Sequence, residues 1–249
     1  MAAGRRRGLI LQHGKDAPPA ILEEWARSRG IDHELHRTWE DPLSADPGEY
    51  GWIATLGSEH TPLADSAPPW VDAEIAFLAR ALDGGVPVLG LCFGGQALAV
   101  AAGGSVRTSD PPEVGWAPVE TSDPELVPPG PWLHYHYDLL VPPAEAAVVA
   151  RSPAGPAAFV LDGSLGLQFH PESTPEQAAI WAGMDAERLG RIGVDPVALA
   201  AAGAEAGEGA RESALRLFDA WWEAAHVRQG AGMGNLSKVA EPEPGSSSD

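Results

Sequence analysis

The chain has 249 residues, and its 35 Asp and Glu residues outnumber its 16 Lys and Arg residues, which gives a formal net charge of −19 at pH 7. This excess of negative charge opposes contact with a phosphate backbone, so we expect no nucleic-acid partner. No apolar stretch approaches the roughly 18 residues of a membrane span, residues 9–11 are too short for a signal peptide, and a single cysteine allows no internal disulfide, so we expect a cytoplasmic protein without a membrane partner.

Apolar runs alternate with helical patterns from residue 9 to residue 91, which is typical of a parallel sheet covered on both faces. A helix opens at Pro18-Pro19, and a second covers 70–82. We predict strands over 9–12, 32–37, 50–56 and 86–91, the second of them at a sheet edge. The inward residues of the two helices are predicted to be Ile21, Leu22, Trp25 and Ala26 in the first, and Val71, Ile75, Leu78 and Leu82 in the second.

From residue 106 to 168 the pattern changes to short strands between proline-rich turns, predicted over 115–119, 146–151, 157–161 and 165–169. We interpret these strands as an antiparallel excursion that returns residues 168–170 to the sheet edge near residue 92. Thr174 then caps a helix that begins at Pro175. The pattern predicts an α/β fold with a flavodoxin-like, open, mainly parallel sheet, helices on both faces, this antiparallel excursion and a C-terminal helical extension.

The C-terminal region divides into two parts. Residues 185–228 form the predicted helical extension, with helices over 198–206 and 211–226 whose aromatic residues recur at helical spacing. Such residues are usually packing residues, here against the flank of the domain or a partner. From 229 to 249 Gly, Ser, Pro and Glu prevail, which predicts a disordered tail.

Cys92 lies within the sequence Gly-Leu-Cys-Phe-Gly-Gly-Gln, directly after the predicted strand 86–91 and before a helix-prone segment. A strand-to-helix turn that exposes its central side chain strains the backbone, and the positions two before and two after must lack a Cβ. Gly90 and Gly94 meet this demand. The following helix directs its first N–H groups and its positive dipole end at the sulfur. Although free cysteine is often a buried apolar residue, this pattern favours a nucleophile.

Residues 166–172 read Gly-Leu-Gln-Phe-His-Pro-Glu and place His170 and Glu172 two positions apart at the end of another apolar strand. A cysteine nucleophile needs a base and an acid that orients it. His170 is suited to accept the thiol proton, Glu172 to hold the tautomer of the ring, and Pro171 to stiffen the spacer. A lone histidine is more often a surface or core residue, but together with the turn at Cys92 it predicts a Cys-His-Glu triad.

The two motifs together resemble those of the class I, or triad-type, glutamine amidotransferase domain, especially the branch similar to the glutaminase domain of GMP synthetase. The resemblance runs from about residue 9 to about residue 181, so residues 1–184 are expected to form the catalytic domain. It implies that Cys92 attacks the side-chain amide of glutamine, that a γ-glutamyl thioester forms, and that ammonia leaves before water releases glutamate. No cofactor is expected.

The resemblance also implies an oxyanion hole. The loop after the third strand carries a glycine pair in the family, and here Gly57 and Ser58 occupy it. Serine adopts some backbone angles only with strain, which makes the conformation of this loop a point to check. The second donor is expected to be the N–H of Phe93.

Substrate contacts are carried over by similarity in the same way. Gln96 resembles the residue that holds the glutamine moiety. The segment 132–138 is similar to a family segment that reads Ser-His-Gly-Asp, with Tyr135 and Tyr137 in the place of serine and glycine. Tyr135 and His136 are therefore expected to shape the substrate pocket.

The pair His134 and His136 has a rival interpretation. Residues two apart on a strand face the same side, so the two imidazoles are placed to chelate a metal ion. No third ligand with convincing spacing follows, and Asp138 suits a hydrogen-bonded loop equally well, so we predict no metal site. The remaining histidines, His13 among them, receive no role.

Two function classes remain open. The first is a stand-alone glutamine amidotransferase that releases ammonia to a separate acceptor enzyme, since the chain shows neither a synthetase domain nor a Walker-type phosphate loop. A synthetase subunit would then bind in trans. The second is a partner-independent γ-glutamyl hydrolase or peptidase that uses the same triad on γ-glutamyl conjugates. A non-catalytic binding protein is disfavoured, because all three triad positions are filled.

Overall fold

The computed structural model describes residues 6–63 and 67–233. Its strands are β1 (Gly8–Gln12), β2 (His33–Arg37), β3 (Trp52–Thr55), β4 (Val88–Leu91), β5 (Ser105–Ala117), β6 (Glu120–Thr121), β7 (Trp132–Val141), β8 (Ala147–Ser152), β9 (Gly155–Leu161) and β10 (Ser164–Leu167). Its helices are α1 (Ala20–Ser28), the short 3-10 helix η1 (Pro47–Glu49), α2 (Pro69–Asp83), α3 (Phe93–Ala101), α4 (Pro175–Met184), α5 (Ala186–Arg191) and α6 (Pro196–Met233).

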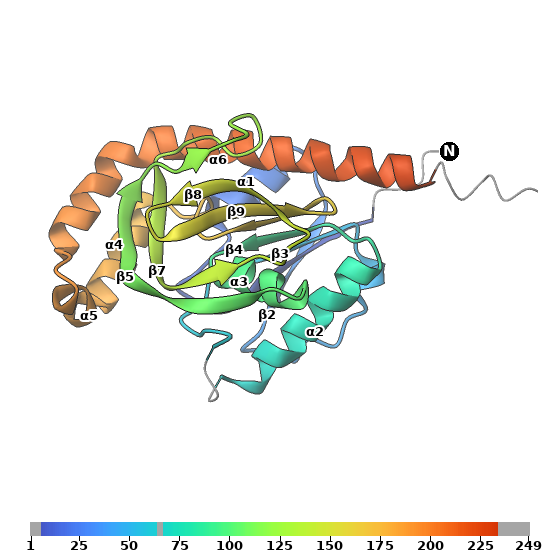
Figure 1. The fold of residues 1–249 in the computed structure, drawn as a ribbon, viewed down its shortest axis with the longest axis horizontal. Helices are drawn as coiled ribbons and strands as arrows, with labels where there is room; N and C mark the ends of the chain where they lie inside the picture. Colours follow the sequence, from blue (N-terminus) through green and yellow to red (C-terminus); the bar gives the residue numbers. More distant parts are fainter. Residues whose placement is uncertain (1–5, 64–66, 234–249) are drawn as a thin grey trace, which may run out of the picture.

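Eight strands form the central sheet in the order β2-β1-β3-β4-β10-β9-β8-β6. The strands from β2 to β10 in this order are parallel to one another, and β9, β8 and β6 continue the sheet antiparallel. Helices α1 and α6 lie on one side of the sheet and α2 and α3 on the other (Figure 1). The predicted fold class is confirmed: an open, mainly parallel sheet with helices on both faces and an antiparallel excursion.

Alternation along the buried strands divides the core into two layers. Ile10 faces a core that contains the buried faces of α1 and α6, whereas Leu9 and Leu11 face a second core with α2 and α3. The parallel strands are buried on both faces, so they appear in the sequence as continuous apolar runs.

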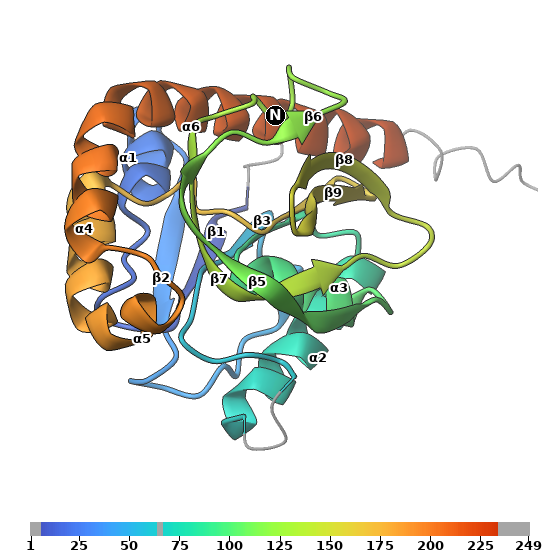
Figure 2. The ribbon, with the colours of Figure 1, turned by 60° about the vertical axis from the view of Figure 1, so that its left-hand side comes forward.

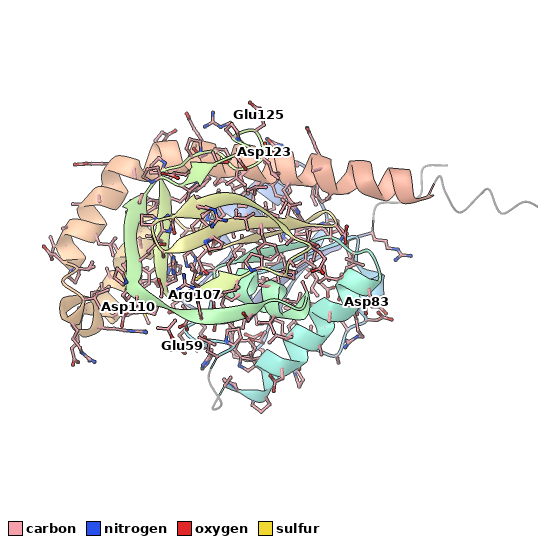
Figure 3. All side chains as sticks on the ribbon, in the orientation of Figure 1. Glu59, Asp83, Arg107, Asp110, Asp123 and Glu125 are labelled. Atoms are coloured by element: carbon pink, nitrogen blue, oxygen red, sulfur yellow. The ribbon has the colours of Figure 1, made fainter. Side chains whose placement is uncertain are left out.

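Acidic side chains such as Glu59, Asp83 and Asp123 are exposed (Figure 3).

The antiparallel excursion differs from its prediction in one respect that matters for the site. Strand β10 pairs with β4 on one side and β9 on the other, so it lies inside the sheet and not at its edge. Strands β5 and β7 form a separate antiparallel pair (Figure 2). An isolated bridge joins Leu133 of β7 to His170, which brings this pair over the end of β10.

The face of α2 also differs from its prediction. Val71 and Leu78 are buried as expected, but Ile75 and Leu82 are half-buried. Phe77, Ala81 and the carboxylate residue Glu74 are buried instead. A buried carboxylate requires polar partners, so a helical-face prediction based on apolar spacing passes over it.

In the C-terminal extension, one long helix, α6, spans the two helices predicted over 198–206 and 211–226, and the short helix α5 precedes it. Helix α6 runs without interruption through Gly203 and Gly207. A Cβ on Gly207 would lie 2.6 Å from Cγ of Pro175, and one on Gly203 would lie 3.0 Å from Nε1 of Trp116. The glycines therefore allow close packing and do not end the helix.

Helix α6 shares the core of the catalytic fold. Trp221 and Phe218 belong to the same cluster as Trp25 and Trp52. The predicted disordered tail begins within this helix, which extends to Met233, and residues 234–249 lie outside the described part of the chain. No described helix combines the length and apolar character needed to cross a membrane.

Candidate active site

Cys92 occupies a strained turn between β4 and α3. Its φ of 51° and ψ of −106° lie outside the regions that side chains normally adopt. A Cβ on Gly90 would lie 2.5 Å from the carbonyl oxygen of Gly94, and a Cβ on Gly94 would lie 2.0 Å from that of Thr55. Both predicted glycine requirements are confirmed. Gly95 adds a third, because its Cβ would lie 2.3 Å from the carbonyl oxygen of Leu167 in the neighbouring strand.

His170 reaches the cysteine because their two strands are neighbours. Leu91 at the end of β4 is in register with Leu167 at the end of β10, and the N–H of Cys92 donates to the Leu167 carbonyl at 2.9 Å. His170 follows three residues after β10. Both side chains therefore line one cleft at the carboxyl ends of parallel strands, where sites in open α/β sheets form.

Glu172 holds the imidazole from behind. His170 Nδ1 lies 2.8 Å from Glu172 Oε1, and the two side chains are only 4% and 3% exposed. Because Nδ1–H donates to the carboxylate, the ring presents Nε2 for proton transfer. The structure thus brings together the three residues that the sequence predicted as a triad.

The surroundings of His170 favour the protonated ring. Burial by itself lowers the pKa of His170, but a thiolate at Cys92 and the carboxylate of Glu172 outweigh burial and raise the pKa to about 10. The imidazole is therefore suited to hold a proton taken from the thiol and to deliver it later.

The loop at Gly57 and Ser58, which the sequence predicts to donate to the oxyanion, lies beside the predicted triad. A Cβ on Gly57 would lie 2.8 Å from Cε1 of His170 and 3.9 Å from Cβ of Cys92, so this glycine faces the reacting groups. Among the described residues only Ala20, Cys92 and Asp162 are non-glycine residues with a positive φ, so Ser58 adopts ordinary backbone angles. Across the cleft, Phe93 is the first residue of α3, where N–H groups have no partner within the helix.

A buried network behind this loop was not predicted from the sequence. His13 Nδ1 lies 3.1 Å from the Gly57 carbonyl oxygen, and His13 Nε2 lies 2.8 Å from Glu74 Oε2. Thr55 Oγ1 donates to the other oxygen of Glu74. Trp70 stacks on the His13 ring with centroids 5.0 Å apart. In the sequence, only the position of His13 at the end of the first strand indicated that it could line the cleft. Its partner Glu74 lies on the face of α2 that was predicted to be apolar.

The three residues assigned to the substrate pocket also line the cleft, which has a volume of about 350 Å³. Gln96 Nε2 donates to the Asp138 carbonyl at 3.0 Å, and His136 Nδ1 lies 3.1 Å from the same oxygen. The backbone carbonyl of Tyr135 lies 3.9 Å from Cys92 Sγ. All three residues therefore border the cleft, but the side chains of Gln96 and His136 are buried and directed at the Asp138 carbonyl.

The C-terminal extension contributes part of the cleft wall. Asp185 and Arg188 line the cleft, and Tyr137 donates to Asp185 Oδ2 at 3.1 Å. The guanidinium carbon of Arg188 lies 3.3 Å from the centre of the Tyr137 ring. Burial, together with the carboxylate of Asp185, raises the pKa of Tyr137 to about 12. Asp185 and Arg188 lie beyond the family motifs, so motif matching alone did not identify them.

The sequence is similar to known proteins over much of its length. A family model described as glutamine amidotransferase class-I matches residues 62–180. A glutamine-hydrolyzing GMP synthase from Psychrobacter arcticus is 36% identical over 181 residues, which are 68% of this chain and 32% of that protein. The corresponding enzyme from Alkalilimnicola ehrlichii is 31% identical over 195 residues, which are 70% and 35% of the two chains. The chain thus spans about a third of the length of these curated relatives.

Solved structures share the fold. A glutamine amidotransferase from Methylobacillus flagellatus superposes with a TM-score of 0.77 at 24% identity, covering 89% of this chain and 96% of that one. At this identity the likeness establishes the fold, and the sequence matches establish the relationship. The chain is a member of the class-I glutamine amidotransferase family.

Proposed function

We propose that the chain hydrolyses the side-chain amide of glutamine through a thioester on Cys92 and releases ammonia to a separate acceptor enzyme. The observation that carries this proposal is the strained cysteine at the start of α3, which lines one cleft with His170, the ring that the buried Glu172 holds. A cysteine that serves only as packing needs neither the strained turn nor the imidazole beside it.

The reaction has two halves. The Cys92 thiol gives its proton to Nε2 of His170, and the sulfur attacks the amide carbon of glutamine. The N–H groups of the Gly57–Ser58 loop and of Phe93 stabilise the oxyanion. When the tetrahedral intermediate collapses, the C–N bond breaks and His170 returns its proton to the leaving nitrogen as ammonia. A water molecule then gives a proton to His170 and attacks the thioester carbon. The C–S bond breaks and His170 returns the proton to the sulfur, which yields glutamate and the free thiol.

The acceptor enzyme is inferred from the relatives. The matched GMP synthases are about three times as long as the aligned region, so most of each lies outside the similarity. We propose that an acceptor-activating synthetase subunit takes up the ammonia by binding this chain in trans.

A partner-independent γ-glutamyl hydrolase is the second candidate function. Asp185 and Arg188 add one acidic and one basic group to the cleft wall from outside the family motifs. Such groups are suited to bind the amino and carboxyl ends of a γ-glutamyl conjugate. This enzyme would use the same thioester chemistry.

Replacing Cys92 by alanine tests the shared chemistry. We expect ammonia release from glutamine to fall by roughly 10³–10⁶-fold, as for other nucleophiles of triads, with an unchanged melting temperature. Intact-protein mass spectrometry should show one glutamine-analogue adduct on the wild type and none on the variant. Full activity in Cys92→Ala would refute the assignment of the nucleophile.

Substrate comparison on the wild type separates the two candidates. Turnover of free glutamine, stimulated by a synthetase subunit, supports the amidotransferase. Turnover of γ-glutamyl conjugates without turnover of glutamine supports the hydrolase.

A further inference from the structure

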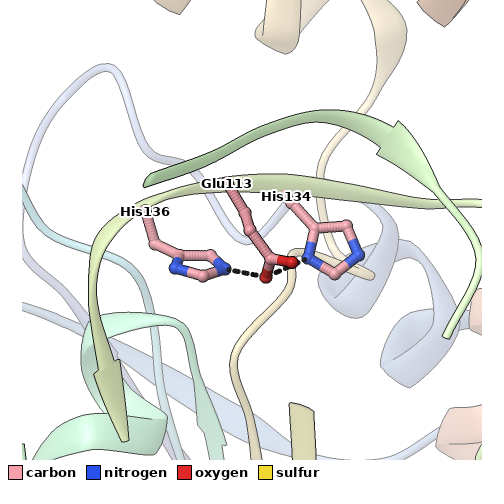
Figure 4. A group of neighbouring side chains, drawn as sticks. All are labelled: Glu113, His134 and His136. Atoms are coloured by element: carbon pink, nitrogen blue, oxygen red, sulfur yellow. Dashed lines mark ion pairs between the residues drawn. The ribbon is translucent and has the colours of Figure 1, made fainter. Parts of the chain in front are cut away.

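A second group of polar side chains lies beside the cleft, on the pair of strands β5 and β7. His134 and His136 alternate with Tyr135 along β7, so both imidazoles point to the same side of the strand. Glu113 of β5 is directly opposite His136 in the strand register. Figure 4 shows its carboxylate between the two rings.

The three side chains have the spacing of ligands to one ion. Oε2 of Glu113 lies 3.2 Å from Nε2 of His136 and 3.7 Å from Nδ1 of His134. One ligand atom from each residue lies within 4.8 Å of the other two. Among the described residues, these three form a cluster of side chains with the spacing of metal ligands. Zn²⁺ binds nitrogen and oxygen at roughly 2.0–2.2 Å in tetrahedral geometry, which places neighbouring ligand atoms about 3.3 Å apart. The two short separations are close to that value.

Three of the four ring nitrogens of His134 and His136 lack a hydrogen-bond partner although both rings are buried. His134 and His136 are each 3% exposed. Both ring nitrogens of His134, and Nε2 of His136, are buried without a hydrogen-bond partner. Leaving a buried polar atom unpaired is unfavourable, so three such atoms around one carboxylate indicate a bound group.

The tautomer of His136 indicates that the missing group is a cation. Its Nδ1 lies 3.1 Å from the carbonyl oxygen of Asp138, an arrangement in which Nδ1 carries the hydrogen. In the neutral ring Nε2 then has a lone pair, which faces the carboxylate oxygen of Glu113. Two acceptors facing each other repel unless a cation lies between them, which can be a proton on Nε2 or a metal ion that binds both.

Hydrogen bonds from outside the group hold the ligands in place. Glu113 Oε2 accepts from Oγ of Ser152 at 2.6 Å, and Oε1 accepts from the N–H of Ala154 at 3.1 Å. The Nδ1–H of His136 donates to a backbone carbonyl in the same way that metal-bound histidines commonly do. The carboxylate and one of the rings are therefore oriented before any ion binds.

We propose that Glu113, His134 and His136 bind one divalent transition-metal ion of the Zn²⁺ type. Two imidazoles and one carboxylate suit Zn²⁺, Co²⁺ or Ni²⁺, whereas Mg²⁺ and Ca²⁺ prefer oxygen ligands. A water molecule would complete the coordination.

The site would stabilise one wall of the catalytic cleft. Tyr135 lies between the two histidines, and its carbonyl faces Cys92 Sγ at 3.9 Å. An ion bound behind the strand fixes β7 at this point and joins it to β5. The ion is thus a structural component, separate from the reacting groups.

Metal titration of the full chain tests the proposal. The protein is stripped with EDTA, dialysed, and titrated with Zn²⁺ while bound zinc is measured by mass spectrometry and the melting temperature by calorimetry. We expect one Zn²⁺ per chain and a higher melting temperature. Glu113→Gln and His134→Gln should each weaken binding at least about 100-fold, since even the loss of an orienting partner costs 10–100-fold.

Two controls separate this site from other ligands. Cys92→Ser should bind Zn²⁺ as the wild type does, and Co²⁺ bound to the wild type should show no sulfur charge-transfer band, because the triad thiol is not a ligand. A double variant, His33→Gln with His36→Gln on β2 at the far edge of the sheet, should also leave binding unchanged.

Circular dichroism of the metal-free variants confirms that each is folded. Failure of the wild type to bind one Zn²⁺, or retention of its affinity in both Glu113→Gln and His134→Gln, would overturn the proposal. If one variant does not fold, the other decides the outcome.

Discussion

Adding a single methyl group at Gly57 tests how exactly the oxyanion loop and the triad must fit. A Cβ there would lie 2.8 Å from Cε1 of His170, whereas carbon atoms in ordinary contact are at least about 3.5 Å apart. The ring or the loop must therefore move by about 0.7 Å. The fold itself has no reason to change, because the contact is confined to the cleft.

The size of the effect follows from this displacement. A misplacement of about 1 Å in a catalytic constellation costs roughly 100-fold in rate. Because the imidazole is held at 2.8 Å by Glu172, a shift of the ring strains the bond that orients it. We expect kcat/KM of Gly57→Ala for glutamine to fall by about 30- to 100-fold.

Steady-state ammonia release and the melting temperature measure this prediction. Gly190→Ala in α5 is the matched control, since no atom lies within 4 Å of the Cβ position at Gly190. The control should keep wild-type activity. Activity of Gly57→Ala within twofold of wild type, in a folded protein, would show that His170 is not held where the structure places it.

Three further predictions concern the triad and the core. Glu172→Gln should lower kcat by about 10²–10⁴-fold, as for the acid of other triads, with exposed Glu176→Gln as the unaffected control in a glutamine-hydrolysis assay. Because the pKa of His170 is raised from 6.5 to about 10 in the folded state, its contribution to stability is complete below about pH 6.5 and is lost as the pH rises toward 10. Urea unfolding between pH 6 and 10 measures this loss, and an equal slope in Glu172→Gln would contradict it. Trp221→Ala should cost about 3–5 kcal/mol in urea unfolding, since the side chain is 1% exposed, whereas Val197→Ala on the exposed face of α6 should cost less than about 0.5 kcal/mol.

The catalytic motifs were predictable because their physical demands are local. The turn at Cys92 needs a residue without a Cβ two positions before and after it, and Gly90 and Gly94 stand at those positions. His170 and Glu172 are close in sequence and meet at 2.8 Å in space. Such constraints are visible in the order of residues alone, and so are the buried parallel strands, whose two apolar faces give continuous apolar runs.

The network behind the oxyanion loop depends on tertiary packing. Glu74 lies on a helix whose spacing indicates an apolar inner face. Its buried carboxylate is acceptable only because it contacts Thr55 at the end of β3 and His13, which directly follows β1. The residues near Glu74 in the sequence do not indicate that His13 and Thr55 are its partners. Burial of a carboxylate is acceptable only with polar partners around it, and these partners come together only when the strands of the sheet are in place.

The sequence by itself predicted Cys92 as the nucleophile and His170 as its base, because each motif consists of residues a few positions apart, and its apolar runs determined the layered α/β fold. Only the tertiary structure decided that Glu113 meets His134 and His136. The register of β5 against β7 includes a shift between Thr108 and Glu113, and a shift of one residue turns every later side chain to the opposite face. A sequence search for ligands after His136 therefore had no means of finding a carboxylate supplied by the earlier strand β5.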